Sequence, residues 1–319
     1  MSLALDEDVP SGLPIAKFSD SNWTAKGVRR AVVHLSALET LWFNTGTLCN
    51  IACEGCYIES SPRNDRLAYL TRADVRTLLL EAKRDHGELK EIGFTGGEPF
   101  MNPDFIEILS DALEAGYRVL VLTNAMKPMS HHKGALLDLH ARFGEKLAIR
   151  VSLDHYTAEG HEKIRGRASW EPAMDGIRWL SREGFDLAIA SRSLSGETEA
   201  EMRAGFAAFF SREGIEIDAN DPHLLVLFPE MDESAEVPEI TQACWGILDK
   251  SPRDVMCSNS RMVVKRKGAD KHVITACTLL PYDERFEMGA TLKEASAPVS
   301  LNHPHCAKFC VLGGASCSA

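Results

Sequence analysis

TLCNIACEGCY, residues 47–57, follows the apolar stretch 41–43 and carries three cysteines, Cys49, Cys53 and Cys56. Three thiolates on a short loop can bind three irons of a [4Fe-4S] cluster and leave the fourth iron open to a small molecule, whereas a closed structural cluster takes four cysteines. A zinc site and buried thiols are the alternatives. Zinc is commonly bound by two pairs of closely spaced ligands, and neither a second such pair nor a nearby histidine follows Cys56. The spacing therefore predicts an iron–sulfur cluster with an open coordination position.

A second motif lies at residues 91–99, which read EIGFTGGEP. An apolar strand there runs into two glycines, Gly96 and Gly97, and then into the carboxylate of Glu98. Paired glycines at a strand end let a ligand approach the backbone closely, and Glu98 would face that ligand. Such a turn is a weak signal by itself. Together with the cysteine loop it indicates a binding site.

The spacing of the three cysteines (C-x3-C-x2-C), the aromatic Tyr57 that follows them and the run GGEP at 96–99 resemble the radical S-adenosylmethionine (SAM) enzymes. The resemblance extends from about residue 41 to residue 230. It implies that the amine and carboxylate of SAM bind the open iron and that the glycine turn meets the amino group. It also implies that the reduced cluster cleaves SAM to a 5′-deoxyadenosyl radical. Tyr57 would meet the adenine through its backbone, and a core aromatic is the alternative interpretation.

The resemblance also implies a set of cofactor-binding residues at the strand ends: Tyr57, Gly96, Gly97, Glu98, Asn124, Ser152 and Arg165. In this set Glu98 would hold the SAM ammonium by a charge-assisted hydrogen bond. Ser152 and Arg165 resemble positions that bind the ribose and the SAM carboxylate, and Asn124 takes a similar ribose role. The alternatives are a solvated arginine and a turn asparagine. Asp154 is a candidate to orient its neighbours.

Six short apolar runs with turn residues near their ends are predicted strands, at 40–45, 91–95, 118–123, 147–153, 186–191 and 224–228. Amphipathic stretches of helical length lie between them, at 72–85, 103–115, 133–143, 170–183 and 197–213. This alternation predicts a parallel α/β fold, and the resemblance implies a partial (β/α)6 TIM-like barrel with a small cysteine-rich C-terminal module. We expect three parts: an N-terminal extension (1–39), the barrel (40–230) and the module (231–319). Reacting groups in α/β barrels lie at the carboxyl ends of the strands, where both motifs fall.

Six further cysteines lie in the C-terminal third: Cys244, Cys257, Cys277, Cys306, Cys310 and Cys317. Their spacing resembles the twitch module, a shortened form of the SPASM extension, and implies an auxiliary [4Fe-4S] cluster on Cys257, Cys277, Cys306 and Cys310. The glycine expected before the second of these cysteines is represented at best by Gly268. The last clip is one residue wider than the common form, so Cys317 is an alternative ligand. A zinc site with His303 or His305, or unrelated buried thiols, are other interpretations.

Composition narrows the class of protein further. The chain has 46 acidic and 35 basic residues and a formal net charge of -11, which does not predict a broad surface for nucleic acid. Residues 1–12 carry three acidic side chains and no apolar run, so they are not a secretory signal, and no later run is long enough to cross a bilayer. We expect a soluble, cytoplasmic protein without a nucleic-acid or membrane partner. In a reducing compartment nine cysteines point to metal binding rather than disulfides.

The predicted function is hydrogen abstraction from an organic substrate, with the second cluster assisting oxidation or substrate binding. The compact C-terminal part favours a small metabolite by size alone, and a peptide or protein side chain is the alternative. The resemblance implies a flavodoxin or ferredoxin-type electron donor. A non-enzymatic iron–sulfur redox protein is a second alternative, which would neither bind nor cleave SAM. A methyl or methylthio transferase is a closer rival, but we find no cobalamin-binding or RNA-binding domain in the sequence.

Overall fold

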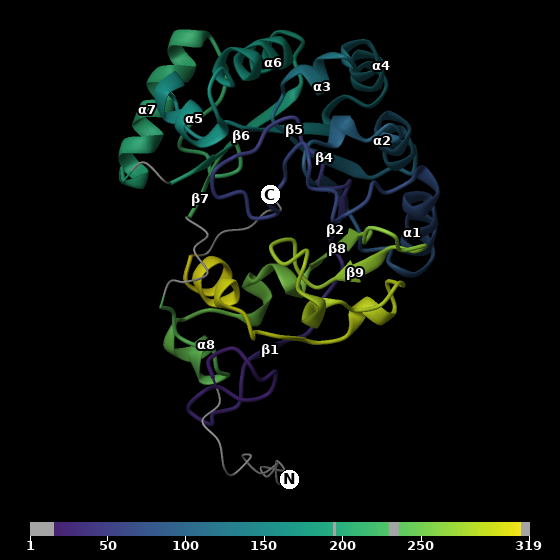
Figure 1. Ribbon diagram of the computed structural model, residues 1–319, viewed down its shortest axis with the longest axis vertical. Helices are drawn as coiled ribbons and strands as arrows, with labels where there is room; N and C mark the ends of the chain where they lie inside the picture. Colours follow the sequence, from purple (N-terminus) through teal and green to yellow (C-terminus); the bar gives the residue numbers. More distant parts are fainter. Residues whose placement is uncertain (1–15, 194–195, 230–235, 314–319) are drawn as a thin grey trace.

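The computed structural model describes residues 16–193, 196–229 and 236–313, and an eight-stranded sheet forms its centre (Figure 1). Six parallel strands follow one another in chain order across it: β2 (Thr40–Asn44), β3 (Glu91–Thr95), β4 (Arg118–Thr123), β5 (Leu147–Ser152), β6 (Asp186–Arg192) and β7 (Leu225–Phe228). These are the six predicted strands, with ends that differ by one residue at most. The predicted parallel α/β fold is confirmed.

Two strands that we did not predict extend this sheet on the other side of β2. β8 (Ser260–Val264) runs parallel to β2, and β9 (Val273–Thr275) runs antiparallel to β8. The N-terminal segment also meets the C-terminal third, because β1 (Val32–Val33) pairs with β10 (Val299–Ser300). The predicted boundary at residue 230 and the candidate ligand Cys317 lie outside the described residues. The division into three parts therefore stays a prediction.

Helices connect the parallel strands along the outer side of the sheet (Figure 1). They are α1 (Arg72–Asp85), α2 (Phe105–Glu114), α3 (Lys127–Ser130), α4 (Lys133–Phe143), α5 (Ala158–Arg165), α6 (Trp170–Arg182) and α7 (Glu199–Glu213). Reciprocal capping boxes of Thr71 with Asp74 and of Thr198 with Glu201 fix the starts of α1 and α7. Glu197, which we predicted as the first residue of a helix, therefore lies in the loop before α7. Within the described ranges, no helix is both long and apolar enough to span a membrane.

The C-terminal third contains shorter elements. They include α8 (Ala243–Ile247), a π-helix (Cys306–Leu312) and four 3-10 turns: Pro252–Asp254, Met256–Ser258, Glu284–Phe286 and Glu294–Ser296. Two more 3-10 turns lie in the barrel, at Pro99–Met101 and Gly144–Lys146.

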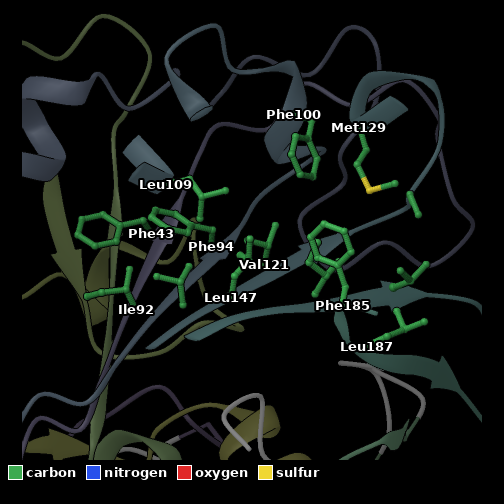
Figure 2. Packing of buried hydrophobic residues seen from close by; sticks show 14 of the residues in the cluster. Phe43, Ile92, Phe94, Phe100, Leu109, Val121, Met129, Leu147, Phe185 and Leu187 are labelled. Atoms are coloured by element: carbon green, nitrogen blue, oxygen red, sulfur yellow. The ribbon is translucent and has the colours of Figure 1, made fainter. Parts of the chain in front are cut away.

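Side chains that alternate along β2 divide the core into two layers. Phe43 joins the cluster beneath the helices, where its ring stacks on Phe94 with centroids 5.8 Å apart (Figure 2). The neighbouring Trp42 belongs to a second cluster with Met262 and Phe309 of the C-terminal third. The C-terminal third is therefore packed onto the sheet face opposite the helices. Each large apolar side chain that is fully buried there contributes about 1.5–3 kcal/mol to the free energy of folding.

Candidate active site

A cavity of about 940 Å³ is lined by the segments that follow the carboxyl ends of β2 to β7 and by two residues of the C-terminal third, Leu279 and Phe309. All three cysteines of the 47–57 loop line it. So do six of the seven predicted cofactor-binding residues: Tyr57, Gly96, Gly97, Asn124, Ser152 and Arg165. The fold therefore brings the two sequence motifs to one place.

The glycine turn packs directly against the cysteine loop. The Gly97 amide donates to the carbonyl oxygen of Gly46 (2.8 Å), and the Glu98 amide donates to that of Leu48 (3.1 Å). A Cβ atom at Gly97 would lie 2.1 Å from the Leu48 oxygen, and Gly96 has a φ of +136°. Glycine is needed here for the approach of one backbone to another, in addition to the ligand approach that we predicted.

Glu98 connects the ends of β3 and β4. Its carboxylate is buried and accepts hydrogen bonds from the Thr123 hydroxyl (2.8 Å), the Asn124 amide (2.9 Å) and the Phe100 amide (3.3 Å). Burial raises its pKa to about 7. Glu98 is the one predicted cofactor-binding residue that does not line the cavity, and its role toward the SAM ammonium stays a prediction.

Asn124, whose backbone amide donates to Glu98, also contacts the cysteine loop. Its side-chain amide donates to Asn50 Oδ1 over 2.8 Å, and it lies 3.8 Å from the Cys49 sulfur. Amide donors beside a ligating sulfur are among the groups that set the properties of an iron–sulfur cluster. Asn124 thus has a position next to a predicted cluster ligand as well as a position on the cavity wall.

Two partly buried arginines share the buried carboxylate of Asp154 and support the other side of the loop. Arg165 Nε donates to Asp154 (2.7 Å), and Arg192 makes a bidentate pair with the same carboxylate (3.0 and 2.9 Å). Arg192 Nη1 also donates to the carbonyl oxygens of Glu54 (2.8 Å) and Gly55 (3.0 Å) in the cysteine loop. Burial alone would raise the pKa of Asp154, but the two arginines lower it to about 2. Asp154 therefore holds both arginines as a permanent anion.

Two thiols of the loop, Cys49 and Cys53, have raised pKa values when no cation is bound. Burial raises the pKa of Cys49 to about 12. Burial also raises the pKa of Cys53, against the opposite effect of Arg165. A metal ion deprotonates a coordinating thiol because it supplies the positive charge that burial removes. The raised pKa values disfavour a free thiolate nucleophile at Cys49 and Cys53.

Residues 43–204, about half of the chain, match one protein family, described as the Radical SAM superfamily. The chain belongs to the radical SAM superfamily. It is therefore an enzyme, and the alternative of a non-enzymatic iron–sulfur protein is set aside. Members of this superfamily use a [4Fe-4S] cluster and SAM.

Curated relatives of this radical SAM enzyme include proteins of different names. The GTP 3′,8-cyclase of Microcystis aeruginosa is 31% identical and covers 48% of this chain and 47% of its own. The antilisterial bacteriocin subtilosin biosynthesis protein AlbA of Bacillus subtilis is 31% identical over 44% of this chain and 30% of its own. Mycofactocin maturase MftC of Mycobacterium tuberculosis is 29% identical over 52% and 40%. The match thus spans less than half the length of each relative.

Solved structures share the fold. SuiB of Streptococcus suis bound to S-adenosylmethionine has a TM-score of 0.58 and 13% identity, covering 80% of this chain and 64% of that one. The enzyme anSMEcpe with bound AdoMet has a TM-score of 0.59 and 14% identity, covering 81% and 77%. At these identities the likeness concerns the partial TIM barrel, which confirms the predicted architecture.

The cavity of this radical SAM enzyme fits a cluster and SAM. Three cysteines line one cavity, and the backbone of Gly96 and Gly97 forms part of its wall. Two further lining residues, Ser60 and Ser191, have buried hydroxyl oxygens without a hydrogen-bond partner among the described residues. Unsatisfied buried hydroxyls are costly, so these positions suit a polar ligand.

Sequence reasoning missed Arg192, Ser191 and a polar group around Glu197. Glu197 accepts hydrogen bonds from His155 Nε2 (2.9 Å) and from the Tyr156 hydroxyl (2.5 Å), and both His155 and Glu197 line the cavity. The Thr157 amide donates to His155 Nδ1 (3.0 Å), which places the ring proton on Nε2. All these residues lie at the ends of predicted strands or in the segments that follow them, and that position was the signal available for finding them.

The C-terminal cysteines lie beyond the family match but gather in one place. Cys257 is buried in the second core cluster, and Cys277, Cys306 and Cys310 pack against the same cluster. Burial raises the pKa of Cys257 to about 11 and that of Cys306 to about 12. Cys306 and Cys310 are four residues apart on one π-helix, and residues about one helical turn apart share a face.

No group of three or more histidine, cysteine, aspartate or glutamate side chains within the described ranges is arranged to hold a single metal ion. The structure thus gives no support to a zinc site that includes His303 or His305. An iron–sulfur cluster differs from such a site because each cysteine binds a different iron.

Proposed function

We propose that this enzyme cleaves SAM reductively and abstracts hydrogen from an organic substrate held in the 940 Å³ cavity. The observation that carries this proposal is the lining of one cavity by Cys49, Cys53 and Cys56 together with the glycine turn. When bound, the reduced cluster and SAM supply an organic radical that can remove a hydrogen atom. The residues of this chain hold the cofactors, position the substrate and exclude water.

The SAM site follows from the lining residues. The three loop cysteines would hold the cluster, and the backbone of Gly96 and Gly97 would meet the SAM amino group. Tyr57 would meet the adenine, while Asn124, Ser152 and Arg165 would meet the ribose and the carboxylate. All four residues are on the cavity wall. If the Glu98 carboxylate turned away from Thr123, it would accept a hydrogen bond from the SAM ammonium. Without that rotation, the role of Glu98 is to hold the end of β4 in place.

The size of the cavity limits the substrate. Single small-molecule sites commonly occupy about 300–1,000 Å³. This cavity of about 940 Å³ must contain a cluster, SAM and the substrate. The remaining volume suits a small metabolite, which is our first candidate, or one side chain inserted from outside.

The charges of the cavity wall disfavour a polyphosphate substrate. The described lining residues include the cations Lys163, Arg165 and Arg192, and two of these three are paired with Asp154. They also include three further carboxylates, Glu54, Glu159 and Glu197. A triphosphate requires a cluster of cationic donors. We therefore infer that the substrate differs from that named for the GTP 3′,8-cyclase.

A peptide or protein side chain is the second candidate. Two of the curated relatives are named for bacteriocin biosynthesis and for mycofactocin maturation, and their identities equal or nearly equal that of the cyclase. A single side chain would fit the remaining volume as well as a small metabolite would. An experiment must therefore decide between a small metabolite and a peptide or protein side chain.

We also propose an auxiliary [4Fe-4S] cluster in the C-terminal module, residues 231–319, beside the barrel of residues 40–230 and the extension of residues 1–39. Its ligands would be Cys257, Cys277, Cys306 and Cys310. Their common location at one core cluster, which Cys244 shares, supports a cysteine site there, and the choice of these four follows their spacing. Such a cluster would accept the second electron of a two-electron oxidation or hold the substrate.

The test is production of 5′-deoxyadenosine by the anaerobically reconstituted enzyme with SAM and a flavodoxin or ferredoxin-type donor. Metabolite-enriched and peptide-enriched fractions of the host lysate are added in parallel, and a Cys53→Ser variant is the control. Stimulation by the metabolite fraction supports the first candidate, and stimulation by the peptide fraction alone supports the second. If neither the reconstituted enzyme nor either mixture yields 5′-deoxyadenosine above the control, the proposal is wrong.

A further inference from the structure

Arg261 is a buried cation whose described partners are all neutral. It lies in β8 opposite Leu41 of β2, and 1% of its surface is exposed. Its guanidinium donates only to backbone carbonyl oxygens, at 2.6 to 3.5 Å: those of Cys257, Ser260, Ala295 and Ala297. These bonds satisfy its donors and leave its charge without a counter-ion.

Two other arginines with little exposed surface face carboxylates. Arg30 pairs with Glu239 at 2.6 Å, and Arg165 pairs with Asp154 at 2.7 Å. Arg261 forms no such salt bridge with any residue that the structure describes. An unpaired charge in a protein interior is unfavourable, and a nearby negative charge would offset that cost.

The neighbours of Arg261 that can become anionic are cysteines. The Cys257 carbonyl accepts its shortest hydrogen bond, at 2.6 Å. Cys277 is linked to the same strand, because the Thr275 hydroxyl donates to the carbonyl oxygens of both Met262, the neighbour of Arg261, and Cys277 (3.2 Å each). A metal bound by these cysteines would hold them as thiolates, and those thiolates would balance the charge of Arg261.

We propose that Arg261 balances the negative charge of a metal–thiolate centre at Cys257 and Cys277, and that it is a positioning residue which raises the reduction potential of that centre. This inference rests on the proposed auxiliary cluster. A [4Fe-4S] cluster with four thiolates is anionic and gains one more negative charge on reduction. A cation buried beside it stabilises the reduced form more than the oxidised form, which raises the potential.

The test uses a background in which the three cysteines of the 47–57 loop are replaced by alanine, so that only the C-terminal cysteines can hold a cluster. The protein is reconstituted anaerobically with iron and sulfide. Iron per chain is measured, and the reduction potential is determined by a titration followed by electron paramagnetic resonance. Arg261→Gln keeps an amide donor and removes the charge, whereas Arg261→Lys keeps the charge and loses the planar fork of donors.

Arg203→Gln is the matched control. Arg203 also donates to backbone carbonyl oxygens, those of Ala219 and Leu225, but it lies on α7 and pairs with Glu199. We expect Arg261→Gln to shift the potential to a more negative value, and we expect Arg261→Lys and Arg203→Gln to leave it near that of the parent. If Arg261→Gln does not fold, the test depends on Arg261→Lys. The inference then requires that Arg261→Lys assembles the cluster with a reduction potential near that of the parent, and a shifted potential would contradict it.

Three results would overturn the inference. One is a folded Arg261→Gln variant with the iron content and potential of the parent. Another is an equal shift in Arg261→Gln and Arg261→Lys, which would mean that the hydrogen bonds matter and the charge does not. The third is a parent that binds zinc or no metal at all, and this result contradicts the auxiliary cluster itself rather than only the role of Arg261.

Discussion

Replacement of Glu98 by glutamine tests whether the hydrogen bonds that Glu98 accepts fully offset the cost of burying its ionised carboxylate at the glycine turn. Burial raises its pKa from 4.5 to about 7, although Asn124, Thr123 and Phe100 all donate to it. The folded protein then binds this proton more tightly than the unfolded chain does. Stability from this group is therefore greatest below pH 4.5, falls as the pH rises to about 7, and is constant above that value.

The magnitude follows from the size of the shift. One pKa unit corresponds to about 1.4 kcal/mol, so the wild type should lose about 3 kcal/mol relative to Glu98→Gln between pH 4.5 and values above 7. The difference between the two proteins is the useful quantity, because other groups titrate in the same range with the opposite sign. Burial lowers the pKa of His161 to about 4, for example, and that contribution rises with pH.

The assay is urea unfolding of the metal-free proteins from pH 5 to pH 8. Glu114→Gln is the control, because Arg142 lowers the pKa of that exposed carboxylate and moves its titration below this range. The reasoning is refuted if the difference in unfolding free energy between wild type and Glu98→Gln is the same at pH 5 and pH 8.

Three further predictions concern the loop and its supports. Gly97→Ala should lower the free energy of unfolding by about 1–3 kcal/mol, because the new Cβ atom would meet the Leu48 carbonyl oxygen. Gly134→Ala should raise it by about 0.5–1 kcal/mol, because Gly134 lies in α4 with open space around it. Equal urea midpoints for the two variants would contradict this prediction. Arg192→Gln should reduce the iron bound by the 47–57 loop after reconstitution while the circular dichroism spectrum persists, and unchanged iron would show that the loop is held without it. Alanine at all three cysteines of that loop should leave an iron–sulfur absorption band from the C-terminal cysteines, and a colourless protein would remove the auxiliary cluster from the proposal.

Local patterns predicted the barrel because each parallel strand is a buried apolar run between turn residues. In β2 and β3 all five residues are buried, as expected for a parallel sheet covered on both faces. The same signal exists in β8, where Ser260–Val264 is also fully buried. We missed that strand because Ser260 and Arg261 leave an apolar run of only three residues and because the cysteines around it suggested a separate module. A strand that joins the sheet from a distant part of the chain leaves no local sign of its partner.

The site was predictable in its residue types and less so in its contacts. C-x3-C-x2-C and GGEP identified two segments that the fold brings into one cavity. They did not show that Gly97 faces the backbone of Leu48 or that Glu98 faces β4. Contacts of this kind depend on which side chains meet across neighbouring strand ends. Asp154 and Arg192 are 38 residues apart and meet only because β5 and β6 are adjacent.

The support of the cysteine loop links the cofactor half of the cavity to the half formed by β5 and β6. One side of the loop rests on the glycine turn after β3 and on Asn124. The other side rests on Arg192, which shares Asp154 with Arg165. Because one buried carboxylate fixes both arginines, a change at Arg192 would also move the backbone that presents the cysteines. We therefore expect substitutions at Ser191 or Glu197 to disturb the loop less than substitutions at Arg192, which donates to the Glu54 and Gly55 carbonyl oxygens.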